Sequence, residues 1–224
     1  MTNRNLPRPT RQDYDKLLQL EKRHNWSDRH IDWLNSFDWS AEAFEENGRR
    51  GLKSAIGDIL LPAEFEDFKL LTGAVLHHGD RITTKQGGLW GVIIADGKGT
   101  WLVEPRYDYI GYPNTLTQAC LKNQWGVLNI LTAEFLITLE CDSVHTHNGS
   151  MFCCSTGTYE KQGKIGILFE NGSFTQAMFD EVDLSAAKPL RVKRNGKWGF
   201  LNESGHFTSD ELSMPAKPDK QQND

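Results

Sequence analysis

The sequence predicts a mainly β protein: an array of about four to five three-stranded β-meander repeats behind a short α-helical N-terminal cap. Three observations lead to this prediction. A short apolar segment with a central glycine recurs along most of the 224-residue chain. An aromatic residue followed by an acidic one comes at a nearly constant distance after most of these glycines, and turn dipeptides such as Asn-Gly separate the apolar segments.

The most complete copy of the segment occupies residues 193–205. Asn195-Gly196 suits a type I′ turn, in which both central residues need positive φ, and Ser204-Gly205 closes the strand that follows. Between these turns, Trp198 supplies a large apolar surface, whereas Gly199 leaves room for a neighbouring backbone or ring. This segment therefore predicts a short β-meander.

Five central glycines set the period of the repeat. They are residues 51, 91, 126, 166 and 199, at spacings of 40, 35, 40 and 33 residues. The second landmark follows the first four glycines by 14, 16, 15 and 13 residues, at Phe65-Glu66-Asp67, Tyr107-Asp108, Cys141-Asp142 and Phe179-Asp180. A unit of this size buries little surface by itself, so neighbouring units are expected to stack, in an open array rather than a propeller-like ring.

These segments resemble the WG-repeat family, whose units run roughly as Asn-Gly-Lys-Trp-Gly-Phe-Ile, a glycine-containing turn, an apolar strand with proline, and Tyr-Asp. The resemblance covers about residues 51–212. It is strongest at residues 195–205, 90–110 and 60–65, and it weakens where Ile165 replaces Trp and Cys141 replaces Tyr. The resemblance implies an all-β, hairpin-built repeat found in many bacterial proteins, and it implies no common catalytic residue.

Residues 11–50 are predicted to form the helical cap, after a disordered lead at residues 1–10. Three helix starts are indicated: a capping box at residues 10–13 before a helix over 11–23, Ser27 before a second helix with Ile31, Trp33 and Leu34, and Ser40 before a third with Ala43 and Phe44, which Gly48 would end. The aromatic side chains of this piece exceed what it can bury alone. We expect them to pack across the first repeat as a cap, and the alternative is a binding surface.

Further strands are predicted where apolar and polar residues alternate, at residues 81–85, 117–122 and 190–193. Each leads through a turn into a glycine-centred segment. The repeat domain therefore spans residues 51–212, and the polar, proline-containing residues 213–224 are expected to be disordered.

The charge of the chain argues against nucleic acid as the principal partner. The formal net charge is −5, and residues 51–187 hold nine basic and 16 acidic side chains, whereas phosphate binding needs a basic surface. The sequence has neither an apolar segment at its start nor an apolar run of about 18 residues. We therefore expect a cytoplasmic protein without a membrane partner.

A candidate chemical site combines His145, His147, Cys153 and Cys154, downstream of Cys141. Thiolate and imidazole groups bind zinc, and a histidine beside a cysteine can activate it as a nucleophile, so a zinc- or thiol-dependent enzyme is one alternative. However, Cys141 occupies the aromatic position of the repeat, and adjacent cysteines on a strand point to opposite faces. We therefore predict free, buried thiols and a polar loop, with no cofactor, metal or catalytic residue.

The acidic landmark residues are the candidate partner-binding site: Glu66, Asp67, Asp108, Asp142, Asp180 and Glu181. Carboxylates aligned along one edge would attract a basic partner, although each could instead accept hydrogen bonds from a turn. The predicted function is a non-enzymatic protein-binding repeat module, a monomer alone or in a 1:1 complex. Most concretely, it would be an immunity-type inhibitor of a bacterial toxin or effector with a basic surface. A self-associating structural repeat is a second alternative.

Overall fold

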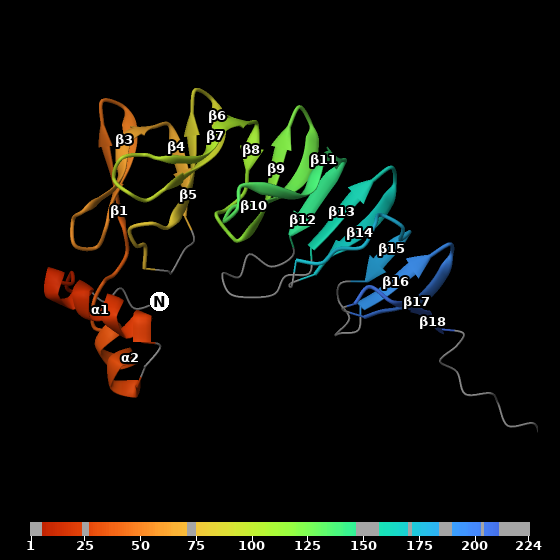
Figure 1. Ribbon diagram of the computed structural model, residues 1–224, viewed down its shortest axis with the longest axis horizontal. Coiled ribbons are helices and arrows are strands. Elements are labelled where there is room, and N and C mark those ends of the chain that lie inside the picture. Colours follow the sequence, from red (N-terminus) through yellow and green to blue (C-terminus); the bar gives the residue numbers. More distant parts are fainter. Residues whose placement is uncertain are drawn as a thin grey trace, which may run out of the picture. The chain divides into compact units, whose positions relative to one another are not determined.

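The computed structural model describes residues 6–23, 27–70, 75–146, 157–169, 172–183, 190–202 and 204–210 (Figure 1). The chain divides into two compact units, Met1–Thr117 with Ile130–Ala133, and Gln118–Asn129 with Glu134–Asp224. The elements of the described residues are α1 (Arg11–Arg23), α2 (Asp28–Leu34), β1 (Glu42–Glu46), β2 (Arg49–Lys53), β3 (Ile59–Phe65), β4 (Asp67–Lys69), β5 (Arg81–Gln86), β6 (Leu89–Ile94), β7 (Trp101–Tyr107), β8 (Tyr109–Ile110), β9 (Leu116–Leu121), β10 (Gln124–Asn129), β11 (Glu134–Cys141), β12 (Ser143–Thr146), β13 (Gly157–Lys161), β14 (Lys164–Leu168), β15 (Glu181–Asp183), β16 (Leu190–Arg194), β17 (Lys197–Leu201) and β18 (Phe207–Ser209).

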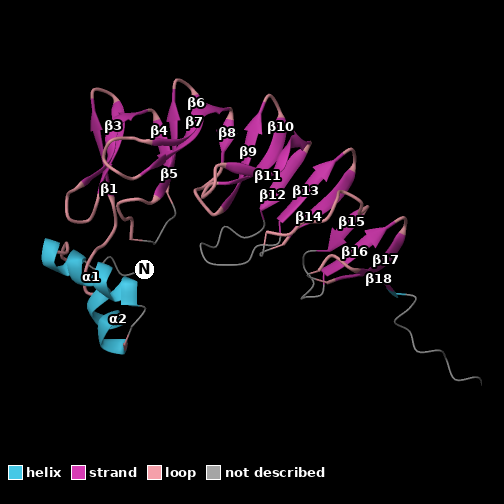
Figure 2. Ribbon diagram, in the orientation of Figure 1, coloured by secondary structure: helices cyan, strands magenta, loops and turns pink. Residues whose placement is uncertain are grey.

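The described chain is mainly β, in several small antiparallel sheets, with short helices at its N-terminal end (Figure 2). The first unit holds the sheets β1-β2-β3 and β4-β5-β6-β7. In the second unit lie the sheets β12-β13-β14 and β15-β16-β17-β18, and the order β11-β10-β9 occurs in a further sheet. The predicted fold class is confirmed at this level, and the strands predicted at residues 81–85, 117–122 and 190–193 correspond to β5, β9 and β16.

Five hairpins share one design. A strand that we call the leading strand (β1, β5, β9, β13 or β16) is joined by two residues to a strand that we call the glycine strand (β2, β6, β10, β14 or β17). Both connecting residues have positive φ in every case, at Asn47-Gly48, Gly87-Gly88, Lys122-Asn123, Gln162-Gly163 and Asn195-Gly196. This is the backbone of a type I′ turn, whose twist matches that of the flanking strands.

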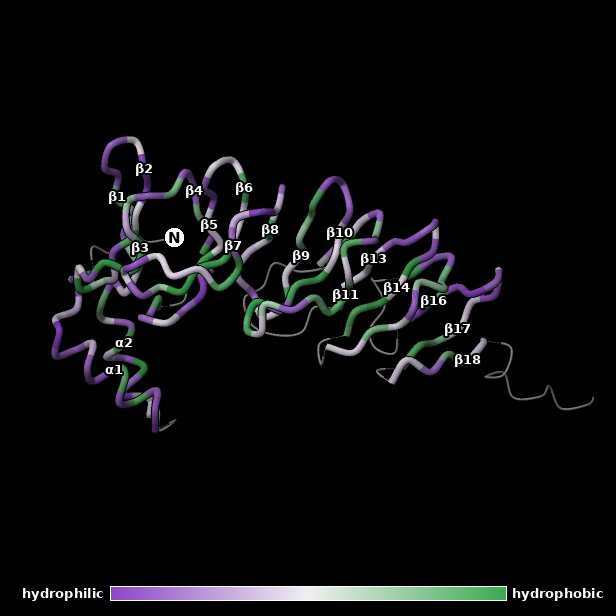
Figure 3. The backbone as a smooth tube through the Cα atoms, turned by 45° about the horizontal axis from the view of Figure 1, so that its top comes forward, coloured by the Kyte–Doolittle hydropathy of each residue, from purple (hydrophilic) through white to green (hydrophobic). Residues whose placement is uncertain are grey.

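The first of these hairpins corrects the predicted third helix. Residues 42–46 form β1 and pair with β2, with Glu46 opposite Arg49 and Phe44 opposite Gly51, so the helix predicted from Ser40 to Gly48 is wrong. The φ values of Asn47 and Gly48 are 52° and 72°, which a two-residue hairpin turn requires. The hairpin tip is hydrophilic (Figure 3). Strand structure therefore begins inside the range that the sequence assigned to the helical cap.

The two helices begin where the sequence predicts. The capping box of α1 is confirmed, because the Thr10 N–H donates to Asp13 Oδ2 at 2.9 Å and the Asp13 N–H donates to Thr10 Oγ1 at 3.3 Å. Ser27 precedes α2, and its N–H donates to His30 Nδ1 at 3.2 Å. Of the described helices, none combines the length and the apolar character needed to cross a bilayer.

At three central glycines, Gly91, Gly126 and Gly199, the backbone of the following strand lies against the position that a Cβ would take, whereas at Gly51 and Gly166 the ring of a leading-strand residue, Phe44 or Tyr159, comes closest. A Cβ on Gly91 would be 2.5 Å from the Val103 carbonyl oxygen, and a Cβ on Gly126 would be 2.6 Å from that of Ile137. The pairing register shifts at these points, so that Trp90 lies opposite Tyr107. Only a residue without a side chain fits this approach.

Each unit has a hydrophobic cluster of its own. The first unit contains Leu52, Leu60, Leu61, Phe65, Ile82, Ile93 and Ala95. The second contains Ile167, Phe169, Phe179, Leu190, Val192 and Leu201. The aromatic residues of the second landmark are therefore core residues, since Phe65, Tyr107 and Phe179 are at most 2% exposed.

Candidate functional site

The predicted acidic residues lie where the chain leaves one strand and starts the next. Glu66 stands between β3 and β4, Asp108 between β7 and β8, and Asp142 between β11 and β12, while Asp180 directly precedes β15. Asp67 and Glu181 are the first residues of β4 and β15. A buried side chain comes just before each of these strand-to-strand connections: Phe65, Tyr107, Cys141 or Phe179. This side chain anchors the connection to the core.

Three of these residues make the same pair of bonds to the next hairpin. The backbone N–H groups of Glu66, Asp142 and Asp180 donate to carbonyl oxygens of the leading strand, those of Lys85 (2.9 Å), Glu160 (2.8 Å) and Lys193 (2.7 Å). Their carboxylates accept hydrogen bonds from turn N–H groups, those of Gly88 (3.1 Å), Gln162 (2.8 Å) and Gly196 (2.9 Å). Each carboxylate therefore holds the turn of the following hairpin, not a turn of its own segment.

At two of these positions, Glu66 and Asp180, the hydrogen bonds favour the ionised carboxylate. The Gly88 N–H, with Arg49, lowers the pKa of Glu66, and the bond from Lys164, followed by that from Gly196, lowers the pKa of Asp180. A carboxylate oxygen that already accepts a hydrogen bond from a turn has fewer lone pairs left for a binding partner.

Nearby cations also reduce the negative electrostatic field of these acidic residues. Ion pairs join Arg49 to Glu66 (3.3 Å), Lys164 to Asp180 (2.5 Å) and Lys193 to Glu181 (2.7 Å), and Arg50 contacts Asp67. Asp108 and Asp142 are exposed. Because these ion pairs lie near the surface, each contributes little to stability, but each lowers the net charge that a partner meets.

Sequence reasoning did not identify a second set of carboxylates. These are exposed strand glutamates with no described cation within ion-pair distance: Glu45, Glu46, Glu64, Glu104, Glu134 and Glu160. They lie outside the aromatic-acid landmark on which the sequence prediction depended. Glu64 in β3 and Glu104 in β7 each stand between two apolar residues of a predicted strand, which is the signal that could have identified these two.

The predicted cysteine–histidine site is described only in part. Cys141 is buried on β11 opposite Trp125, and burial raises the pKa of its thiol. His145 lies on β12 opposite Thr158. His147, Cys153 and Cys154 lie outside the described residues. In the described part of the chain, Cys120 and Cys141 are buried and form no disulfide, and no three His, Cys, Asp or Glu side chains are arranged to hold a metal ion.

The N-terminal aromatic residues pack against each other and against Ile56, between β2 and β3, and Val75, between β4 and β5. The rings of Trp33, Phe37 and Trp39 meet edge to face at 5.7 to 6.0 Å, in a cluster that includes Ile56 and Val75. Polar contacts add to this docking, because His77 bonds Tyr14 Oη through Nδ1 (3.0 Å) and Glu21 through Nε2 (3.2 Å). Through these contacts the N-terminal aromatic residues are joined to the segments next to β3 and β5, and Trp26 lies outside the described residues.

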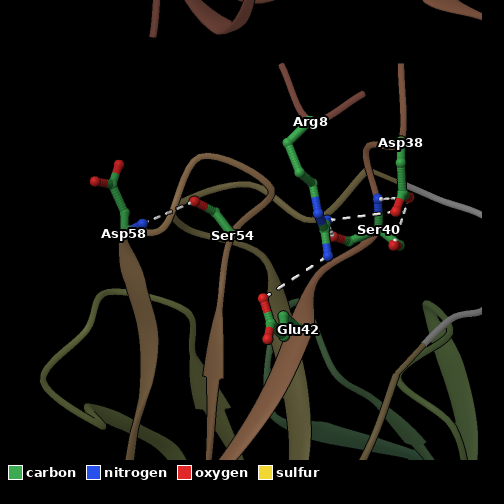
Figure 4. Close-up of polar contacts among 6 residues, drawn as sticks. All are labelled: Arg8, Asp38, Ser40, Glu42, Ser54 and Asp58. Carbon is green, nitrogen blue, oxygen red and sulfur yellow. Dashed lines mark hydrogen bonds and ion pairs between the residues drawn. The ribbon is translucent and has the colours of Figure 1, made fainter. Parts of the chain in front are cut away.

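Arg8, in the described part of residues 1–10, also contacts the segment that leads into β1. Arg8 contacts the Ser40 carbonyl and lies 3.8 Å from the carboxylates of Asp38 and Glu42 (Figure 4). Close by, Asp38 Oδ1 accepts bonds from the Ser40 N–H and hydroxyl at 3.0 and 2.6 Å. The side chains of Arg8 and Asp38 therefore both hold Ser40, which lies two residues before β1.

Lys69 is a further residue that sequence reasoning missed. Its Nζ lies 4.1 Å from the Trp90 ring centroid and 3.7 Å from that of Tyr109, and it donates to the Ile110 carbonyl. Burial lowers the pKa of Lys69 to about 8. The two rings and the carbonyl stabilise the charged amine, so its position is that of a structural cation joining β4 to β6 and β8.

Comparison with protein-family models found no match to this chain, and comparison with curated proteins found no similar one.

Proposed function

We propose that the protein is a non-enzymatic binding module built from WG-type β-repeats. Support comes from the agreement between the spacing of the glycines in the sequence and the recurring hairpin with its type I′ turn. The shared hydrogen bonds of Glu66, Asp142 and Asp180 to the next hairpin add to this support. A module that repeats one scaffold varies its exposed side chains, and these are the groups available to a partner.

The partner in this proposal is a protein with a basic surface, bound in a 1:1 complex. The observation that carries the proposal is the set of exposed strand glutamates without a described cation, which spans both units. Together with the acidic excess of residues 51–187, they favour a negative field that speeds association with a basic protein. The most concrete form is an immunity-type inhibitor that covers the basic active-site surface of a bacterial toxin or effector.

The test is capture of a partner at low ionic strength, followed by a salt titration. We expect one basic protein at 1:1 stoichiometry, with an association rate that falls as salt rises. Glu104→Gln, which neutralises one of these exposed strand glutamates, should slow association. Asp15→Asn, an exposed change on α1 outside the acidic region, is the matched control. A complex indifferent to salt, or failure of any basic protein to bind at low salt, would contradict the proposal.

A further inference from the structure

The outer edge of the leading strand β1 pairs with no strand among the described residues. The leading strands β5, β13 and β16 each pair with a short outer strand, β4, β12 and β15 respectively, in the antiparallel sense. In the sheet β1-β2-β3, β1 is itself the edge strand, and no described strand pairs with its outer side. The first hairpin thus lacks a neighbour that its counterparts have.

The outward backbone groups of β1 can be identified from the register. Glu46 and Arg49 flank a two-residue turn, so they form a hydrogen-bonded pair, and the alternation of an antiparallel ladder makes Phe44 and Gly51 the next such pair. Ala43 and Glu45 therefore direct their N–H and C=O groups away from β2. Both residues are exposed, and no described backbone group outside the strand ladders bonds to either.

The charge of β1 is opposite to that of β5 and β16. In those two sheets, acids on the outer strand face cations on the leading strand: Asp67 opposite Lys85, Glu181 opposite Lys193, and Asp183 opposite Arg191. On β1, three of five residues are glutamates, and the register places them opposite Lys53, Arg50 and Arg49 of β2. Arg49 and Arg50 form their ion pairs with Glu66 and Asp67 instead. Glu45 and Glu46 have no described cation within ion-pair distance, and the side chain of Glu42, near Arg8, is 67% exposed. A strand that completes this edge should therefore carry cations.

We propose that β1 is a docking edge that takes an extended, lysine- or arginine-containing segment of a partner protein as an added antiparallel strand. This inference rests on the proposed function and specifies how its basic partner is engaged. Main-chain hydrogen bonds to Ala43 and Glu45 hold the segment, and the glutamates select its charge. A second copy of this chain is a poor occupant, because two β1 strands would bring glutamates together.

The first experiment uses a labelled seven-residue peptide of alternating lysine and valine with the full chain. We expect saturable binding by fluorescence anisotropy, together with slower hydrogen exchange at the Ala43 and Glu45 amides. The same peptide with N-methyl groups on the backbone amides of one edge keeps its charge but cannot complete the ladder, so it should bind about tenfold more weakly. Equal binding of the two peptides would overturn the proposal.

Variants of the chain test the docking edge independently of the modified peptide. Ala43→Pro removes an outward N–H and leaves the bonds to β2, so it should weaken binding about tenfold without unfolding the hairpin. Glu45→Lys should weaken binding similarly. Glu104→Lys on β7 makes the same change in net charge away from β1 and should have a smaller effect. If Ala43→Pro does not fold, the N-methylated peptide decides alone.

The outcomes separate this inference from the proposed function. If Glu104→Lys weakens peptide binding as much as Glu45→Lys, the acidic surface binds cations in general, and the docking edge is refuted while the proposed function stands. A dimer in sedimentation that Ala43→Pro dissociates would show that β1 pairs with a second copy, and it would overturn the partner named here. Loss of all salt-dependent binding to a basic protein would instead contradict the proposed function.

Discussion

Single residues of the glycine strands decide how closely two strands approach. A Cβ on Gly126 would be 2.6 Å from the Ile137 carbonyl oxygen and 3.0 Å from the backbone of Thr138, where no flexible side chain can move aside. The sequence predicted that these glycines leave room for a neighbour. It could not name that neighbour, because the pairing register of β10 with β11 shifts at this point, and the spacing of residues does not predict such a shift.

Gly126→Ala is expected to lower the free energy of unfolding by about 1–3 kcal/mol, since the added methyl group forces two backbones apart. The matched control is Gly157→Ala, whose Cβ would be 3.3 Å from the His145 carbonyl oxygen and 3.4 Å from the Leu168 side chain. Gly157→Ala should lower the free energy of unfolding clearly less than Gly126→Ala. Urea unfolding of both variants measures the difference, and equal losses would contradict the steric explanation.

Asp96 shows how a turn sets the ionisation of one side chain. Burial by itself would raise the pKa of Asp96, but the Thr100 hydroxyl and the N–H groups of Lys98, Thr100 and Gly99 lower it to about 2. The folded chain therefore binds this proton more weakly than the unfolded chain does. Its contribution to stability is complete above the ordinary pKa of 3.8 and is lost as the pH falls through about 2.

Asp96→Ala should accordingly cost about 1 kcal/mol at pH 7 and progressively less between pH 4 and pH 2. Unfolding free energies of the wild type and the variant across this range give the difference. Asp96→Asn also lacks the titrating group, so the gap between the Asn and Ala variants should not depend on pH. A wild-type advantage that is constant from pH 5 to pH 2 would exclude this assignment.

At the scale of one element, the acidic crossing residues connect a strand end to the next hairpin. Asp180 accepts from the Gly196 N–H at 2.9 Å, from a turn that lies 16 residues further along the chain. The sequence identified the recurrence of these acids and offered turn bonding as the alternative to partner binding. The identity of the turn depends on strand pairing, which spacing alone does not specify.

Asp180→Ala is expected to speed hydrogen exchange at the Gly196 amide, because that N–H loses its only described acceptor. Glu160→Ala, an exposed acid on β13 whose carboxylate caps no described turn, should leave Gly196 unchanged. Amide exchange followed by NMR measures both. Unchanged exchange in Asp180→Ala would show that the turn is stable without the carboxylate.

The β1–β2 hairpin is the element that sequence reasoning assigned wrongly. Ser40 and Gly48 are typical of the two ends of a helix, and the glutamates between them are good helix formers. Asn47-Gly48 also suits a hairpin turn, and pairing with β2, itself bonded to β3, settles the choice. Tertiary pairing outweighs a local propensity of a few tenths of a kcal/mol per residue.

At the scale of the whole chain, stability is distributed over separate clusters. Leu61 is fully buried in the first unit and Ile167 in the second, and the two clusters have no member in common. Changes in clusters without shared partners should add, whereas changes within one cluster should interact.

Leu61→Ala should cost about 2–5 kcal/mol and Ile167→Val about 1 kcal/mol, and the double variant should match their sum within about 0.5 kcal/mol. Ile167→Val combined with Val192→Ala, both in the second cluster, is the comparison in which coupling is expected. Denaturant unfolding of the single and double variants provides the values. Coupling of more than about 1 kcal/mol between Leu61 and Ile167 would contradict separate cores.

By itself, the sequence determined the fold class, the helix starts at Thr10 and Ser27, and most of the glycine strands, because capping groups, turn dipeptides and alternation act over a few residues. Only the tertiary structure decided that residues 42–46 are a strand, which turn each acidic residue holds, and which glutamates have no described cation beside them. Those outcomes depend on which strands pair. Pairing is set by burial and hydrogen bonding between segments, and the local propensity of one segment does not specify its partner.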